Sequence, residues 1–175
     1  MNNPQPTQKS GHSLFFLCSY PKSGRTWLRF ILANYLNQIF NLNLTLDFWT
    51  LFTLLPNGGS HPQKGLPVYK FAHKTDIPVI ISSHGLWQDR FNKGKIIFLL
   101  RSPTDLLISY YCHLFYSMGV YHENIHNFIR DPEMGIAHLI VYLNQWSQHL
   151  DLNQTHILSY EQMQSNTEKN CNGNH

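Results

Sequence analysis

The sequence predicts an α/β domain in which a parallel central sheet is flanked by helices. Short apolar runs, typical of strands buried on both faces, alternate with segments whose apolar residues recur at helical spacing. This alternation favours a parallel sheet, because parallel neighbours need a crossover connection that is usually a helix. The 175 residues fit one domain with a sizeable core, and the 14% of aromatic residues exclude a disordered chain or a coiled coil.

A strand, a turn and a helix are predicted at the start of the domain. The continuous apolar run 14–18 indicates a buried strand, and residues 19–24 have the composition of a turn. The helix that follows has an apolar side made by residues at helical spacing: Trp27, Phe30, Ile31, Tyr35 and Ile39.

Two further strands are predicted in the middle of the chain, at residues 78–82 and 95–100. A short helix at 87–92 would connect them. The segment 41–64 has no readable pattern apart from a strong loop signal at 56–59.

The C-terminal part is predicted to contain two helices and a last strand. One helix covers 105–115, with Ser102 as its N-cap and Pro103 in its first turn, and the other covers 137–150. The last strand is predicted at 156–159. The second helix carries an apolar stripe that we expect to pack in the core: Ile136, Ile140, Leu143 and Trp146.

The domain is expected to span residues 13–165, between a flexible lead-in at 1–12 and a disordered tail at 166–175. No signal peptide is visible, and the apolar runs are far too short to cross a bilayer. The three cysteines share no CxxC spacing, which indicates reduced thiols rather than a disulfide framework. We therefore predict a cytoplasmic protein without a membrane span.

Charge is distributed unevenly along the chain. Residues 1–101 contain eleven Lys and Arg against three Asp, or +8, whereas residues 102–175 contain two against seven acidic residues, or −5. This asymmetry predicts an anionic partner for the N-terminal half. The cations form no basic run, so nucleic acid is not the partner that we expect.

The turn after the first strand has the chemistry of a phosphate-binding loop. A helix N-terminus offers free N–H groups to an anion, Gly24 lets the backbone approach closely, and Lys22 adds a charge. Ser23 and Thr26 add hydroxyl donors. The Walker A pattern is absent because the lysine precedes the glycine. The alternative is an ordinary strand-to-helix turn with a surface lysine.

Three segments resemble the sulfotransferases that use 3′-phosphoadenosine 5′-phosphosulfate (PAPS). The loop YPKSGRTW at 20–27 resembles their 5′-phosphosulfate loop, and IFLLRSPTDLLISYY at 97–111 resembles their 3′-phosphate site. More weakly, ILSYEQM at 157–163 is similar to the family's strand near the adenine. The resemblance implies a P-loop NTPase-like three-layer sandwich and transfer of the PAPS sulfonate to an acceptor hydroxyl or amine. The acceptor would be a small molecule, a glycan or a lipid, and no metal is required.

The resemblance also assigns roles to single residues. Lys22 would stabilise the bridging and leaving oxygens, Arg101 and Ser109 would hold the 3′-phosphate, and Trp27 and Tyr160 would flank the adenine. The complete set of cofactor-binding residues that it implies is Lys22, Ser23, Gly24, Arg25, Thr26, Trp27, Arg101, Ser109 and Tyr160.

His84 is the candidate catalytic base that would act with Lys22. It follows an apolar strand, where open α/β sheets bind ligands and where the family places its catalytic histidine. His73 is the reserve candidate, and a purely structural His84 is the alternative. For Glu161 a structural role is favoured over a chemical one.

The sequence departs from the family pattern at three places. Ser82 stands where many members have a lysine, and Arg25 stands where cytosolic members usually have a threonine. The family's Gly-rich closing segment does not follow Met163. We therefore expect a C-terminally truncated sulfotransferase, whose alternative function is that of a catalytically impaired, nucleotide-binding remnant.

A competing motif, HExxH, is formed by His122-Glu123-Asn124-Ile125-His126 and suggests a zinc metalloprotease as a remote alternative. Gly119 and Pro132 leave little room for the helix that the motif requires. A histidine pair in a loop or at a helix cap is the favoured interpretation.

Overall fold

The described residues of the computed structural model, 13–58, 69–71 and 73–165, form a parallel sheet of four strands. The lead-in and the tail predicted at the two ends lie outside these residues. The order across the sheet is β2-β1-β3-β4, and every pair is parallel, as predicted. The strands are β1 (Leu14–Ser19), β2 (Val79–Ser83), β3 (Lys95–Leu100) and β4 (Thr155–Ser159).

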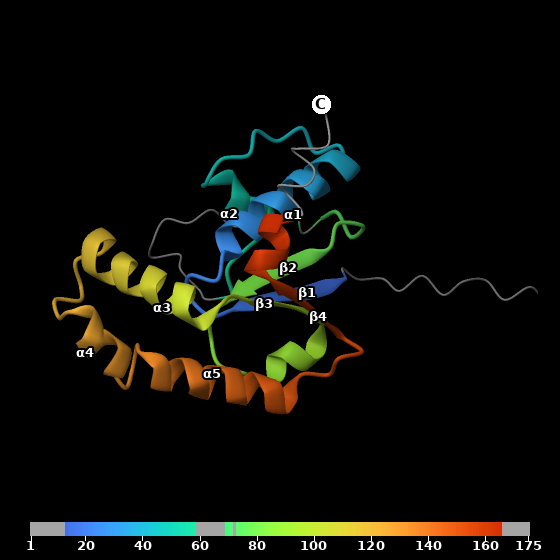
Figure 1. Ribbon diagram of the computed structural model, residues 1–175. Helices are drawn as coiled ribbons and strands as arrows, with labels where there is room; N and C mark the ends of the chain where they lie inside the picture. Colours follow the sequence, from blue (N-terminus) through green and yellow to red (C-terminus); the bar gives the residue numbers. More distant parts are fainter. Residues whose placement is uncertain (1–12, 59–68, 72, 166–175) are drawn as a thin grey trace, which may run out of the picture.

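Helices cover both faces of this sheet and complete a three-layer sandwich (Figure 1). On one side lie α1 (Arg25–Ile39) and α2 (Thr50–Leu54). The other side carries α5 (Ile136–His149) and the 3₁₀ helix η2 (Asp89–Lys93), which replaces the short helix predicted at 87–92. The remaining elements are α3 (Pro103–Cys112), the π-helical turn η3 (His113–Ser117) that continues it, and α4 (Ile125–Arg130). The predicted α/β fold is confirmed.

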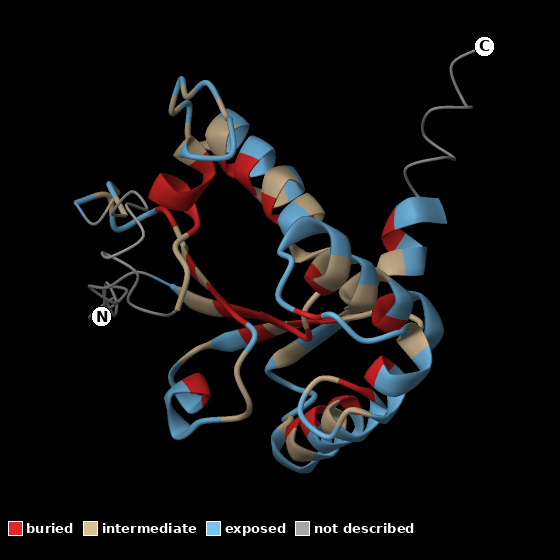
Figure 2. Cartoon of the chain, turned by 90° about the vertical axis from the view of Figure 1, so that its left-hand side faces the viewer, coloured by how far each residue is buried: buried red, intermediate tan, exposed pale blue. Residues whose placement is uncertain are grey.

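Successive residues of the two central strands contribute to different cores. In β1, Phe16 and Cys18 pack toward the α5 side, whereas Leu17 packs toward α1. In β3, Phe98 and Leu99 divide in the same way. The sheet therefore separates two buried clusters, and its centre is buried on both faces (Figure 2).

The face of α1 that packs on the sheet agrees only in part with the predicted one, of which Trp27 and Phe30 pack against the core. Ile31, Tyr35 and Ile39 are exposed, whereas Leu28 and Leu36 are buried. Apolar residues occur on nearly every side of this helix, so periodicity alone does not identify the face that is buried. Leu28, Ala33 and Leu36 pack in one buried cluster, and these contacts define the buried face of the helix.

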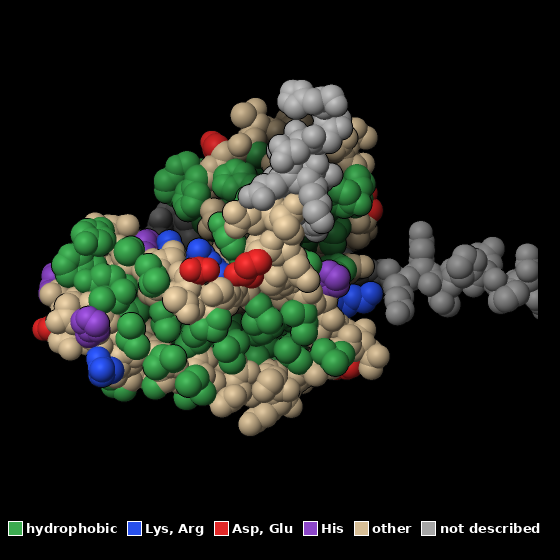
Figure 3. Space-filling model, in the orientation of Figure 1, with side chains coloured by type: hydrophobic (Ala, Val, Ile, Leu, Met, Phe, Trp, Pro, Cys, Tyr) green, Lys and Arg blue, Asp and Glu red, His purple; other side chains and the backbone are tan. Residues whose placement is uncertain are grey.

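The apolar stripe predicted on α5 is also only partly buried. Of its members, Trp146 is fully buried, while Ile136 and Ile140 are exposed. The buried side is instead made by Leu139, Tyr142 and Trp146. Figure 3 shows hydrophobic side chains covering much of the surface over α3 and α5.

The HExxH segment does not form the arrangement of a zinc protease. Helix α4 begins only at Ile125, and the Asn124 side chain caps it by accepting from the Asn127 amide at 3.0 Å. His122 therefore precedes the helix and does not lie one turn before His126 on it. Within the described ranges, no three His, Cys, Asp or Glu are grouped to hold a metal, and no helix is long and apolar enough to span a membrane.

Candidate active site

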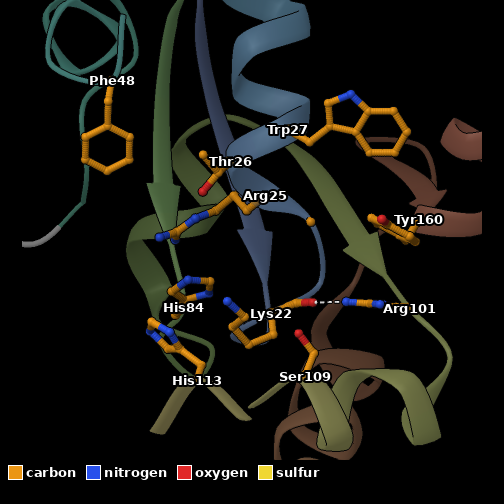
Figure 4. Close-up of a pocket in the computed structure, with 11 residues that line it drawn as sticks. Lys22, Arg25, Thr26, Trp27, Phe48, His84, Arg101, Ser109, His113 and Tyr160 are labelled. Carbon is orange, nitrogen blue, oxygen red and sulfur yellow. Dashed lines mark hydrogen bonds between the residues drawn. The ribbon is translucent and has the colours of Figure 1, made fainter. Parts of the chain in front are cut away.

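All four strands end at one edge of the sheet, where the residues that follow them line a common cavity. Lys22 follows β1, His84 follows β2, Arg101 follows β3 and Tyr160 follows β4. Because β1 connects onward to β2 on one side and pairs with β3 on the other, this edge is the ligand-binding position of an open α/β sheet. The cavity measures about 620 Å³ (Figure 4), and its walls are Lys22, Gly24, Arg25, Thr26, Trp27, Phe48, His84, Arg101, Ser109, His113 and Tyr160.

The loop between β1 and α1 has a backbone that only glycine adopts easily. Gly24 has φ +92°, and a Cβ atom there would lie 2.5 Å from Cδ2 of Tyr160. Lys22 also has positive φ, at 66°. Helix α1 begins directly afterwards, so its first N–H groups lack partners within the helix and lie beside the cavity.

Arg101 connects the loop to the last strand. Its Nη1 donates to the Lys22 carbonyl at 2.9 Å, and its guanidinium lies over the Tyr160 ring at 4.4 Å. Tyr160 in turn packs edge-to-face on Trp27, with the ring centres 5.5 Å apart. These contacts fix Arg101 at the end of the cavity where Ser109 also lies (Figure 4).

His84 is held in one tautomer on the other side of Lys22. Its Nδ1 lies 2.7 Å from the Ser19 carbonyl, which only accepts, so Nδ1 carries the proton and Nε2 keeps a lone pair. The residue is open to the cavity. Desolvation against the cavity wall and the charge of Arg25 lower the pKa of His84 to about 4, so the imidazole is neutral at pH 7.

The charge of the cavity matches an anionic ligand. Its described walls contain Lys22, Arg25 and Arg101 but no Asp or Glu. Burial lowers the pKa of Arg25 to about 10, which still leaves the guanidinium charged at neutral pH. Phosphate and sulfate groups are the ligands that such a set of donors recognises best.

The structure brings together all but one of the cofactor-binding residues that the sequence predicts. The exception is Ser23, whose hydroxyl is buried and which lines a different, smaller cavity. His84 lines the main cavity, whereas His73 is exposed and does not.

Two residues of the cavity wall were missed. His113 lies one helical turn beyond Ser109, and that spacing was sufficient to find it. Phe48 belongs to the segment without a readable pattern, so no signal pointed to it. Burial and the nearby charge of Lys22 lower the pKa of His113.

The structural role predicted for Glu161 is confirmed. Its carboxylate accepts from the Ser102 amide at 2.8 Å, at the N-terminus of α3, where Ser102 itself makes no side-chain cap. This hydrogen bond is the main reason that the pKa of Glu161 lies below its ordinary value.

The sulfotransferase domain family matches residues 13–172 of the sequence. The chain belongs to the sulfotransferase family. Sulfotransferase 6B1 of Gorilla gorilla gorilla is 26% identical over 175 residues, covering 91% of this chain and 53% of that protein. The chain thus spans about half the length of this curated relative.

Solved sulfotransferases share the fold of this one. A sulfotransferase from Alicyclobacillus acidocaldarius superposes with a TM-score of 0.56 at 16% identity, over 92% of this chain and 79% of that one. Mouse sulfotransferase SULT7A1, complexed with PAP, superposes with a TM-score of 0.54 at 17% identity, over 90% of this chain and 55% of that one. The resemblance found in the three sequence segments is confirmed, and with it the P-loop-like α/β fold.

Proposed function

We propose that this sulfotransferase binds PAPS in the 620 Å³ cavity and transfers the sulfonate to a hydroxyl or amine of a small-molecule, glycan or lipid acceptor. One observation carries the proposal: the loop at 20–24 between β1 and α1, Arg101 and a neutral His84 lie together at a single edge of the sheet. The structural neighbours complexed with PAP, SULT7A1 and retinol dehydratase, add support.

The residues present fit such a nucleotide. The backbone amides of the loop and Lys22 would hold the 5′-phosphosulfate of the nucleotide, and Arg101 with Ser109 would hold its 3′-phosphate. Arg101 uses one nitrogen for the Lys22 carbonyl and keeps further N–H donors for a ligand. Trp27, and the side of Tyr160 that Arg101 does not cover, would flank the adenine at the same end.

The catalytic roles follow from the positions of His84 and Lys22. PAPS supplies the sulfonate and a phosphate leaving group when it is bound. The Nε2 lone pair of His84 would accept the acceptor's proton, because Nδ1 is engaged by Ser19. Lys22 lies between His84 and Ser109 in Figure 4, where its ammonium would stabilise the charge that develops during an in-line displacement.

The proposal is tested in two steps with the full chain. Calorimetry measures binding of 3′-phosphoadenosine 5′-phosphate (PAP), and an assay with PAPS then measures transfer to a phenolic acceptor. We expect binding and transfer for the native protein, and for His84→Gln normal binding with transfer reduced about 10²–10⁴-fold. His73→Gln is the matched control and should behave as the native protein does.

Failure of PAP to bind would refute the cofactor site. Binding without transfer to any acceptor would instead favour the alternative function, a nucleotide-binding domain that is catalytically impaired.

A further inference from the structure

Three polar side-chain atoms, one of them in the loop between β1 and α1, are buried without a hydrogen-bond partner among the described residues: Ser23 Oγ, the Nε of Arg101 and the Tyr142 hydroxyl. Ser23 and Tyr142 are each only 1% exposed. Buried polar atoms are nearly always paired, since a bare one forfeits its hydration without compensation. These three atoms therefore call for a partner beyond the described residues of the protein.

All three residues line the same small cavity, which is separate from the nucleotide-sized one. It measures about 20 Å³, and its remaining walls are apolar or aromatic: Tyr20, Leu99, Leu100, Pro103, Leu106, Leu139 and Leu143. One water molecule needs roughly 10–15 Å³ of such space and two to four polar partners. The cavity therefore has room for one water molecule, and the three residues with unpaired buried atoms all lie in its wall.

We propose that a single buried water molecule occupies this cavity and bridges Ser23, Arg101 and Tyr142. Each of the three atoms then gains one hydrogen bond: the Nε–H of Arg101 donates to the water oxygen, the water donates to one hydroxyl oxygen, and the other hydroxyl donates to the water. Burial raises the pKa of Tyr142 further above neutrality, so its hydroxyl keeps its proton.

The bridge joins three elements that are far apart in the sequence. Ser23 lies in the loop after β1, Arg101 follows β3, and Tyr142 lies in α5. The Nη1 of Arg101 is already fixed by the Lys22 carbonyl and its face by Tyr160. The water fixes Nε as well, so Tyr142 is a positioning residue for Arg101 although it does not line the main cavity.

A crystal structure of the full chain at about 1.8 Å or better tests the proposal without any ligand. We expect one density peak within hydrogen-bond distance of all three atoms in the native protein. The peak should disappear or move in Tyr142→Phe, and it should persist in Tyr111→Phe, whose ring lies outside this cavity. Direct hydrogen bonds among the three side chains around an empty cavity would overturn the proposal. An anomalous signal from bromide in the cavity after soaking would also overturn it, because the site would then bind an anion.

If Tyr142→Phe does not fold, a measurement in solution with a different variant tests the proposal. Water-oxygen relaxation dispersion should count one long-lived water fewer in Ser23→Ala than in the native protein, and an equal count would overturn the proposal.

A binding readout depends on the function proposed above. We expect Tyr142→Phe to bind PAP about two- to tenfold more weakly, the equivalent of one hydrogen bond. If the native protein does not bind PAP, the cofactor site fails while the density peak still decides the water site.

Discussion

The imidazole of His84 illustrates how one backbone carbonyl selects a chemical role. Ser19 ends β1, and its carbonyl lies 2.7 Å from Nδ1 of a residue that follows the neighbouring strand. The parallel pairing of β1 with β2 therefore sets the tautomer of His84, and with it the nitrogen that faces the cavity. A histidine on a free loop would not be oriented in this way.

Histidine NMR of the free protein tests this assignment. We predict that His84 shows the Nδ1–H tautomer and remains neutral as the pH falls from 8 to 5, because its pKa is lowered to about 4. Replacing Arg25 with Met should raise that pKa part of the way toward 6.5, since one positive charge is removed. A His84 that titrates near 6.5 in the native protein would contradict the prediction.

The pKa of His84 also affects stability. The unfolded chain binds more protons than the folded protein between pH 6.5 and about 4, so the contribution of His84 makes the protein less stable as the pH falls through this window.

Arg101 should discriminate between nucleotides by their 3′-phosphate. We predict that Arg101→Ala weakens PAP binding about 10–100-fold, the equivalent of one or two charge-assisted hydrogen bonds. The affinity for an analogue without the 3′-phosphate should fall far less. Some loss is expected for this ligand too, because the substitution removes the hydrogen bond from Arg101 to the Lys22 carbonyl. Calorimetry with both ligands measures the difference, and Arg130→Ala is the control, because Arg130 is exposed on α4. Equal losses for the two ligands would remove Arg101 from this role.

The start of helix α1 depends on the backbone conformation of Gly24. We predict that Gly24→Ala lowers the free energy of unfolding by about 1–2 kcal/mol from the positive φ alone. The clash with the Tyr160 ring adds to this cost. Urea unfolding measures the loss. Gly85→Ala is the matched control, because Gly85 has no left-handed φ and the nearest atom to its Cβ would be 3.4 Å away.

Helix α3 should depend on a carboxylate that is distant in sequence. Removing the bond from Ser102 in Glu161→Ala should cost about 1 kcal/mol, or about 2–4 °C in Tm. Because the folded pKa of Glu161 is lowered, the advantage of the native protein is present above the ordinary carboxylate pKa and is lost as the pH falls through the lowered value. Thermal unfolding at pH 7 and pH 3 measures both effects. Glu133→Ala, on an exposed turn, should change neither, and an equal loss at both pH values would refute the role of charge.

Over the whole molecule, the sequence predicted the limits of the strands well and the buried faces of the helices poorly. Strand β3 begins and ends where predicted, because a run buried on both faces has sharp limits. The predicted faces of α1 and α5 were only partly right, because residues such as Ile31 and Ile140 are as apolar as those that are buried.

The same contrast holds for the site. Lys22, Arg101 and Tyr160 were predictable because each lies in a segment that resembles a family motif, and each directly follows a strand or lies in the loop after one. The inward turn of Ser23 and the contribution of Phe48 depend on tertiary packing, which no local pattern records.

The parallel sheet has a consequence for how the chain acquires its native state during synthesis. Leu14 pairs with Val79 and Phe15 with Lys95, so β1 leaves the ribosome well before either of the strands that it pairs with. The contact between Arg101 and Lys22 spans 79 positions, and Tyr160 closes over Gly24 later still. Such non-local pairing makes folding slow. The loop between β1 and α1 is therefore translated long before the residues that hold it in place, and we expect it to become ordered late.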